Sequence, residues 1–219
     1  MARAPQKPAP PRIAYPDVPA DLEDATTVRA RENAFQLRWA SLEPVTDAAH
    51  AMISECVVEG ASVERLDLTG AVLTDVEITD LRATEVAART SRWRTVRVRG
   101  GRIGTLDLSG ATLGSVELRG VRVDYLSLGS AKVTDLSIVD CTIGAIDLPN
   151  AVWSRVSFEG CRADEVDNRG MRSTDVDLRG LEAVAFTDPT ALRGVTLTER
   201  QTIGLSGAFA SALGIDVRD

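Results

Sequence analysis

Apolar and polar positions alternate with a five-residue period over residues 51–186. Two positions of each unit are almost always apolar, one in the series that starts at Ala51 and one in the series that starts at Ile53. The exceptions are Ser91, Gly101, Asn168 and Ser173. Each unit therefore reads apolar–polar–apolar and then two further residues. Since alternate residues of a strand point to opposite faces, the first three residues predict a minimal strand with two inward side chains.

The last two residues of each unit are predicted to turn the chain. The second of them is Gly, Asp or Asn in about half of the units, as at Gly60, Gly70 and Asn150, and these residues tolerate the backbone angles of tight turns. Such short units fit neither a helix nor a sheet of ordinary strands. Repeats that cannot bury their own apolar side stack on copies of themselves. The pattern therefore predicts an all-β solenoid.

The first inward position alternates between large and small residues, as in Leu66 and Ala71 or Leu106 and Ala111. This alternation has a period of ten residues, so it requires an even number of units in each coil. Large side chains on opposite walls would then close a narrow core.

Several units resemble the A-(D/N)-L-x-x signature of pentapeptide-repeat proteins. The units that carry the resemblance are Ala71-Val72-Leu73, Ala111-Thr112-Leu113-Gly114-Ser115 and Val176-Asp177-Leu178-Arg179-Gly180. The resemblance implies a right-handed quadrilateral β-helix with four units per coil. Residues 51–186 would then form about seven coils, a rod roughly 33 Å long at ~4.8 Å per coil. The chain departs from the family in using Val, Leu or Ile where Ala is typical, on every second unit.

The two ends do not keep the repeat. Residues 1–20 are rich in proline and predict an extended, disordered tail, with a proline-rich ligand for a groove as the alternative. Residues 21–50 are expected to cover the open N-terminal end of the solenoid. In residues 187–219, Thr198 and Gln201 fit a capping box, and a helix is expected to follow. Its apolar stripe includes Leu205, Phe209 and Leu213.

The C-terminal helix has two possible roles. We expect it to act as a lid on the last coil. The resemblance offers the alternative, because a C-terminal helix also mediates dimerisation in part of that family, so a homodimer through residues 198–217 is a second hypothesis.

Composition favours one elongated, non-enzymatic domain. The chain has 219 residues, a formal charge of −7 and only 4% aromatic residues. It lacks an apolar run of membrane-spanning length and the apolar core of a signal peptide, so we expect a cytoplasmic protein that does not contact a membrane.

Cys56, Cys141 and Cys161 take inward positions and are expected to be buried free thiols. With a single histidine, His50, and no nucleophile beside a base, we expect no catalytic, cofactor or metal site.

Charged residues suggest a candidate interaction surface on two walls of the rod. One wall carries Asp67, Asp107, Asp147 and Asp167, and another carries Arg82, Arg102, Arg122 and Arg162. A maintained ladder of like charge suggests a partner of opposite charge. The alternative, which we favour at this point, is local pairing of Arg122 with Asp124 and of Arg162 with Asp164. The remaining arginines of residues 89–102 ring the rod, so direct nucleic-acid binding is not expected.

Two functions follow from these patterns. The first is a scaffold whose flat walls bind an unknown protein partner. The second comes from the resemblance alone, because some pentapeptide-repeat proteins mimic duplex DNA, bind DNA gyrase and protect it from quinolones. Residues 51–186 have a net charge of only −5, with arginines in the middle, which suits a DNA mimic less well. Asn168, the buried polar exception, is expected to bridge backbone groups near the C-terminal end.

Overall fold

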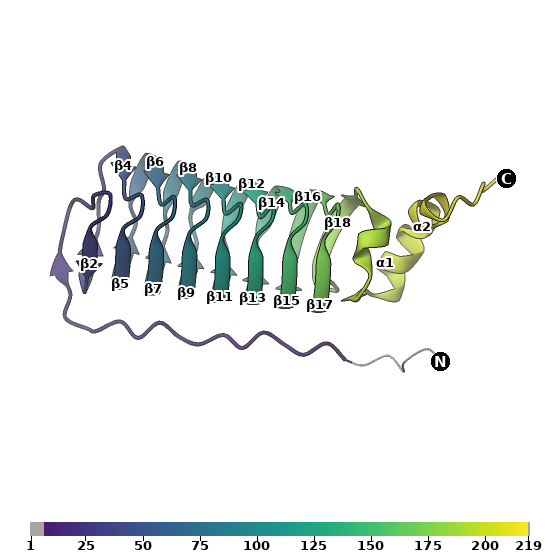
Figure 1. Cartoon of the computed structure of the whole chain (residues 1–219), viewed down its shortest axis with the longest axis horizontal. Coiled ribbons are helices and arrows are strands. Elements are labelled where there is room, and N and C mark those ends of the chain that lie inside the picture. The colour runs from purple at the N-terminus through teal and green to yellow at the C-terminus, as the bar shows by residue number, and fades with distance from the viewer. Residues whose placement is uncertain (1–6, 219) are drawn as a thin grey trace.

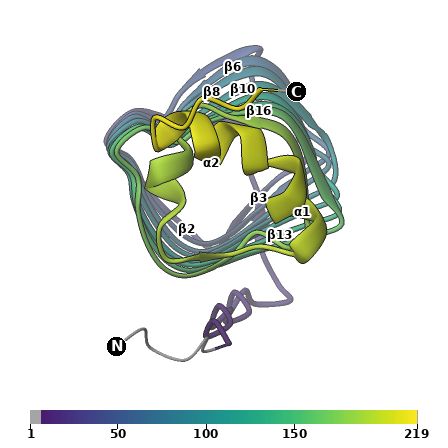
Figure 2. The same ribbon diagram turned by 90° about the vertical axis from the view of Figure 1, so that its right-hand side faces the viewer.

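The protein is an all-β solenoid closed by short helices at its C-terminal end (Figure 1). The structure, a computed structural model, describes residues 7–218. Viewed along the axis, the coils superpose into a four-sided outline (Figure 2). Neither of the α-helices in the described part of the chain is long and apolar enough to cross a membrane.

The strands form two parallel sheets. The eleven-stranded sheet contains β1 (Glu23–Asp24), β2 (Asn33–Phe35), β3 (Leu37–Trp39), β5 (Met52–Glu59), β7 (Val72–Thr79), β9 (Arg92–Arg99), β11 (Thr112–Arg119), β13 (Lys132–Val139), β15 (Val152–Glu159), β17 (Arg172–Asp177) and β19 (Val195–Thr196). The eight-stranded sheet contains β4 (Val45–Asp47), β6 (Ser62–Asp67), β8 (Arg82–Ala87), β10 (Arg102–Asp107), β12 (Arg122–Ser127), β14 (Thr142–Asp147), β16 (Cys161–Asp167) and β18 (Leu181–Phe186).

Each coil contains four five-residue units. Within the repeat, every strand pairs in parallel with the strand twenty residues later, as Leu73 does with Trp93 and Ile103 with Val123. The eight-stranded sheet takes one strand from each of eight turns. The solenoid is therefore one turn longer than the seven coils expected from residues 51–186, because β2, β3 and β4 add an irregular first turn.

Three of the four corners in a coil use left-handed backbone at the last residue of the unit. Examples within one coil are Asp75, Asp80 and Thr90, with φ between 49° and 55°. The fourth corner does not, and it accepts residues such as Tyr125 and Ala145. This difference explains why only about half of the units end in Gly, Asp or Asn, since only a positive φ favours those residues.

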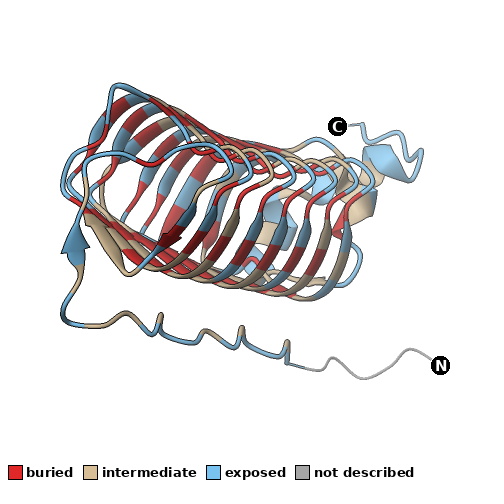
Figure 3. Ribbon diagram, turned by 60° about the vertical axis from the view of Figure 1, so that its left-hand side comes forward, coloured by how far each residue is buried: buried red, intermediate tan, exposed pale blue. Residues whose placement is uncertain are grey.

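The inward positions form one continuous core along the rod (Figure 3). Trp93 and Trp153 are 2% and 3% exposed, beside the small residues Ser91 and Ala151. Both therefore fill the core, and neither is a platform for stacking bases. Each indole N–H is buried without a hydrogen-bond partner in the described part of the chain, which costs roughly 1–3 kcal/mol for each group.

Asn168 confirms the expected bridge to the backbone. Its side chain is fully buried. The amide Nδ2 donates to the carbonyl of Asp188 at 2.7 Å, and the amide oxygen accepts from the N–H of Asp188 at 2.9 Å. These two bonds replace the sheet ladder where Pro189 ends the repeat, so one side chain ties the last turn to the coil below it.

The C-terminal segment differs from the single helix expected from the sequence. After a short 3₁₀ helix at Pro189–Leu192, it forms two helices, α1 (Glu199–Gly204) and α2 (Ser206–Ala212), with a break at Leu205. The capping box at Thr198 and Gln201 is present. Gly204 and Gly207 flank the break, and glycine is the weakest helix former after proline.

Only part of the expected apolar stripe reaches the rod. Leu205 and Phe209 pack, partly buried, against the core, whereas Leu213 is 74% exposed. Leu205 and Phe209 thus contact the core of the solenoid, whereas Leu213 faces solvent.

The proline-rich segment is ordered against the rod over its described part, which corrects the expectation of a disordered tail. Residues 7–20, which we call the strap, run back along the outside of the solenoid from its C-terminal end to β1 (Figure 1). Four backbone N–H groups of the strap donate to side chains of the solenoid. The rest of the expected tail, residues 1–6, lies outside the described residues.

Candidate protein-binding face

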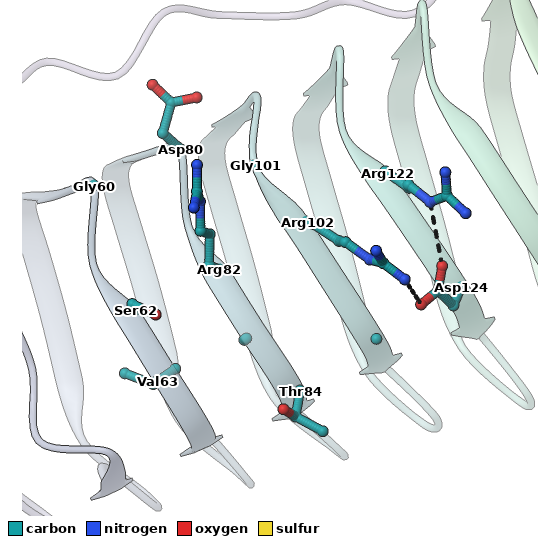
Figure 4. Close-up of a pocket in the computed structure, with 12 residues that line it drawn as sticks. Gly60, Ser62, Val63, Asp80, Arg82, Thr84, Gly101, Arg102, Arg122 and Asp124 are labelled. Carbon is teal, nitrogen blue, oxygen red and sulfur yellow. Dashed lines mark hydrogen bonds and ion pairs between the residues drawn. The ribbon is translucent and has the colours of Figure 1, made fainter.

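Three of the four candidate arginines stand in one row on the outer surface of the eight-stranded sheet. Arg82 begins β8, Arg102 begins β10 and Arg122 begins β12. Arg82 is in register with Arg102, and Arg102 with Arg122, so the three lie on successive coils (Figure 4). Each occupies the middle position of the three-residue strand of its unit, which points it away from the core. We call this row and its surroundings the arginine face.

Arg162 stands apart from the other three. Thr142 occupies the same position on the coil between Arg122 and Arg162. Arg162 pairs with Asp164 at 3.7 Å, and both side chains are more than 60% exposed. The structure therefore brings together three of the four expected residues and leaves the fourth in an ordinary local ion pair.

An open hollow of about 1180 Å³ lies along the arginine face (Figure 4). Its lining includes small residues, among them Gly60, Ala83, Gly101 and Gly104. A Cβ at Gly101 would lie 2.2 Å from the carbonyl oxygen of Leu81, and one at Gly104 would lie 2.5 Å from that of Thr84. Glycine is therefore required at both positions, and neither position adds a side chain to the surface beside the arginines.

The arginines of the hollow are only partly neutralised. The carboxylate of Asp124 forms ion pairs with the guanidinium groups of Arg102, at 3.0 Å, and Arg122, at 3.4 Å. The Arg102 guanidinium is the main cause that lowers the pKa of Asp124 below its ordinary value, with Arg122 adding to the effect. Arg82 makes no ion pair with any described residue. The expected pair between Arg122 and Asp124 is thus present, but one carboxylate serves two guanidinium groups and the third has none.

The acidic wall is not a continuous ladder. In the register of the sheet, Ala87 separates Asp67 from Asp107, and Ser127 separates Asp107 from Asp147. Only Asp147 and Asp167 are neighbours. Arginines also pair with three of the four carboxylates, namely Arg65 with Asp67, Arg89 with Asp107 and Arg169 with Asp167.

These aspartates have a structural role that sequence reasoning missed. The carboxylate of Asp67 accepts the N–H of Thr69 at 2.9 Å, and Asp107 accepts that of Ser109 at 3.0 Å. Asp167 does the same for residue 169. Each carboxylate thereby closes an Asx turn ahead of a corner. The signal was present in the sequence, because Asp stands three residues before Gly70, Gly110 and Gly170.

The three cysteines are buried free thiols. Burial raises the pKa of the Cys56 thiol. The contact with Cys161, together with burial, raises the pKa of the Cys141 thiol. Cys56 and Cys141 therefore stay protonated, and protonated thiols are poor nucleophiles and metal ligands. The contact between the two thiols lowers the pKa of the Cys161 thiol, which is buried in the core beside Cys141. No group of three or more His, Cys, Asp and Glu that could hold a metal ion occurs within residues 7–218.

The hollow also contains residues that sequence analysis did not single out as a site. Asp80, Thr84, Gly101 and Gly104 line it with the arginines. Gly101 was visible as a break in the apolar series, so the interruption of the repeat was the available signal. Its meaning depended on knowing which face of the coil it occupies.

Comparisons with known proteins give a likeness in structure alone. No family model matches the chain, and no curated protein matches it either. Two solved structures of trypsin-treated variants of QnrB1, described as a plasmid-mediated fluoroquinolone resistance protein, are similar to this chain. Their sequences are 16% and 15% identical to it, with TM-scores of 0.45 and 0.44. Each match covers 89% of this chain and 99% of the other.

Proposed function

We propose that the protein is a non-enzymatic scaffold whose arginine face binds an acidic surface of a partner protein. The observation that carries the proposal is the row of Arg82, Arg102 and Arg122 beside the hollow. The side chains of Arg102 and Arg122 are 61% and 60% exposed. Arginine is suited to this role because its planar guanidinium binds carboxylates through two parallel hydrogen bonds.

Like charges on successive coils support the same proposal. Neighbouring coils are ~4.8 Å apart, so guanidinium groups in register repel one another. A partner that placed carboxylates over the hollow would relieve this repulsion, and the absence of large side chains at Gly101 and Gly104 leaves room for its backbone. Binding of this kind weakens as salt rises, because exposed charges are screened.

The alternative is a DNA-mimicking modulator of DNA gyrase, which would use the acidic wall. The rod shape and the resemblance of the repeat units to pentapeptide-repeat proteins prompt this hypothesis. The charge pattern favours it less, since arginines pair with Asp67, Asp107 and Asp167, and the wall is broken by Ala87 and Ser127. A supercoiling assay with purified gyrase, with and without a quinolone, tests it. Inhibition or drug protection at micromolar protein would favour the alternative over the scaffold.

A defined acidic probe tests the scaffold. The change is the triple variant Arg82→Gln, Arg102→Gln and Arg122→Gln, and the probe is a fluorescent peptide of ten glutamates. We expect the wild type to bind the peptide at low salt and the triple variant to bind it at least tenfold more weakly. The matched control removes the same charge from another face, through Arg92→Gln, Lys132→Gln and Arg172→Gln, and should retain most of the binding. Equal loss in both variants would show that net charge, not the arginine face, attracts the peptide.

A further inference from the structure

The strap contacts the solenoid with a regular pattern of its own. Its half-buried residues alternate in steps of three and two along the chain. They are Pro8, Pro11, Ile13, Pro16 and Val18, and Pro19, which directly follows Val18, ends the alternation. In each of the first four cases the following residue donates its backbone N–H to the solenoid. The strap therefore repeats every five residues, as Pro8-Ala9-Pro10-Pro11-Arg12 and then Ile13-Ala14-Tyr15-Pro16-Asp17.

The acceptors form a single row at one corner of the solenoid. Ala9 donates to Asp175 at 3.1 Å, and Arg12 donates to Asp135 at 2.9 Å. Ala14 donates to the hydroxyl of Ser115 at 2.8 Å, and Asp17 donates to Asp75 at 3.4 Å. All four acceptors occupy the same place in the coil, at multiples of twenty residues, and all four have positive φ. We call these four residues the acceptor row.

The dimensions of a polyproline II helix explain the spacing. From Asp175 to Asp75 the acceptor row spans five coils, or about 24 Å at ~4.8 Å per coil. The eight residue-to-residue steps from Ala9 to Asp17 cover this distance at about 3.0 Å per step, close to the 3.1 Å rise of polyproline II. One five-residue strap repeat thus advances three coils. An extended β-strand would advance faster and lose the register.

The surface under the strap contains an ion pair that is buried although it lies on the outer face of the sheet. Arg97 and Glu117 occupy outward positions on β9 and β11, yet they are only 5% and 6% exposed. Arg97 Nε and Nη2 donate to Glu117 at 3.1 and 2.6 Å. The ring of Tyr15 lies over the Arg97 guanidinium at 4.1 Å. A buried ion pair on an outer face is costly unless its groups are fully paired, so this face is matched to an occupant.

We propose that this face, the acceptor row together with Arg97, is a binding site for a proline-rich peptide in the polyproline II conformation. The strap is the ligand that this chain supplies to its own site. The site recognises the backbone through four N–H groups spaced by three, two and three residues, and an aromatic side chain through Arg97. Prolines at the other positions lower the entropy lost on binding, because they are already extended. The proposal is independent of the function assigned to the arginine face.

A strand-exchange experiment on the full chain tests the site. A protease recognition sequence is inserted between Ala20 and Asp21, and the purified protein is cut there. A fluorescent peptide of residues 7–20 is then titrated, with anisotropy as the readout. We expect saturable binding to the cut protein through exchange with its own strap, and no binding to the uncut protein. Circular dichroism of the cut protein verifies that the solenoid stays folded.

Two matched controls separate this site from non-specific attraction. The first is the same peptide with N-methyl groups on Ala9, Arg12, Ala14 and Asp17, which removes the donors and keeps the side chains. The second is a pair of solenoid variants at Asp135 and Asp175. Changing both to Gly removes the acceptors while tolerating the positive φ, whereas changing both to Asn keeps an acceptor oxygen. We expect the N-methylated peptide and the Gly variant to lose at least tenfold in affinity and the Asn variant to stay within about threefold.

Hydrogen exchange on the uncut wild-type chain supplies a test that needs no variant. The amides of Ala9, Arg12, Ala14 and Asp17 should be protected, and those of Ile13, Tyr15 and Val18 should exchange freely. Uniform rapid exchange along the strap would overturn the proposal. It would also be overturned if the cut protein bound the N-methylated or a composition-matched scrambled peptide as tightly as the native one.

Discussion

At the scale of single residues, polar side chains hold together the places where the repeat fails. Asn168 is the clearest case, because it supplies both a donor and an acceptor to Asp188 where the sheet ladder ends. The sequence predicted that this amide must find backbone partners, since it interrupts an otherwise apolar series. It did not reveal which residue supplies these backbone partners, because Asp188 lies beyond the end of the repeat.

Replacing Asn168 by Leu should destabilise the C-terminal end. The change leaves the N–H and carbonyl of Asp188 without their partners, which costs roughly 2–4 kcal/mol in the free energy of unfolding. Urea denaturation followed by circular dichroism measures the loss. Asn150→Gly, which removes an exposed amide from a turn, serves as the control and should change stability by less than about 0.5 kcal/mol. Equal stability of Asn168→Leu and the wild type would contradict the bridging role.

The aspartates that close turns should make stability depend on pH below about 4. Arg169 holds the pKa of Asp167 below its ordinary value of 3.8, and Arg179 does the same for Asp177. A lowered folded-state pKa contributes stability that is present above the unfolded pKa and lost as pH falls through the folded one. We therefore expect the free energy of unfolding to fall as pH drops below about 4. Either Asp167→Asn or Arg169→Gln should flatten this fall, and a pH series of urea titrations would show it.

The acidic wall shows why residue roles were misread. Asp67, Asp107 and Asp167 resemble a charged ladder in the sequence, because their spacing in multiples of twenty residues assigns them to one wall of the solenoid. Their side chains instead turn back to their own backbone. Sequence spacing gives the wall that a residue occupies but not whether its carboxylate is already used.

At the scale of elements, the repeat predicted the strands and corners because each unit has the same local physics. It did not predict the split between α1 and α2. The apolar stripe continues across the break, but Gly204 and Gly207 have a low propensity to form a helix. The repeat also did not predict the strap. The five-residue pattern of the strap is visible in the sequence, but its acceptors are twenty or forty residues apart and become a row only once the coil is closed.

Replacing two apolar residues near the C-terminus, Phe209 and Leu213, should change the stability of the protein to different extents. Phe209→Ala should lower the free energy of unfolding by about 2 kcal/mol, since its partly buried ring packs against the core. Leu213→Ala should leave the monomer's stability unchanged, because that side chain is 74% exposed. Sedimentation velocity of the wild type and both variants tests the homodimer through residues 198–217, the second hypothesis for this segment. A wild-type dimer that Leu213→Ala dissociates would establish this helix as the dimer contact.

The ion pair under the strap should behave as a unit. Arg97→Leu alone should cost about 2–3 kcal/mol, somewhat less than a fully unpaired buried charge, because Arg119 still lies 3.4 Å from Glu117. The double change Arg97→Leu and Glu117→Leu should recover most of that loss. Urea titrations of the two variants would give the coupling free energy. Additive losses would mean that the pair is solvated and that the strap does not cover it.

At the scale of the whole molecule, the solenoid presents different surfaces around one rod. One face is covered by the strap, one wall carries aspartates that serve its own turns, and the arginine face stays open beside a hollow. The fold could be predicted almost entirely from the period of the repeat. The candidate site could be predicted only in part, since three arginines were placed correctly, but the hollow depends on backbone approach at Gly101 and Gly104.

The most direct test of the central claim is quantitative capture of partners on the immobilised full chain from a lysate of its own organism. The wild type is compared with the triple variant at Arg82, Arg102 and Arg122 and with the charge-matched triple variant at Arg92, Lys132 and Arg172. We expect an acidic protein that the wild type and the matched control retain, that the arginine-face variant loses, and that elutes as salt rises. Retention of the same proteins by all three would contradict the proposal that the arginine face binds the partner.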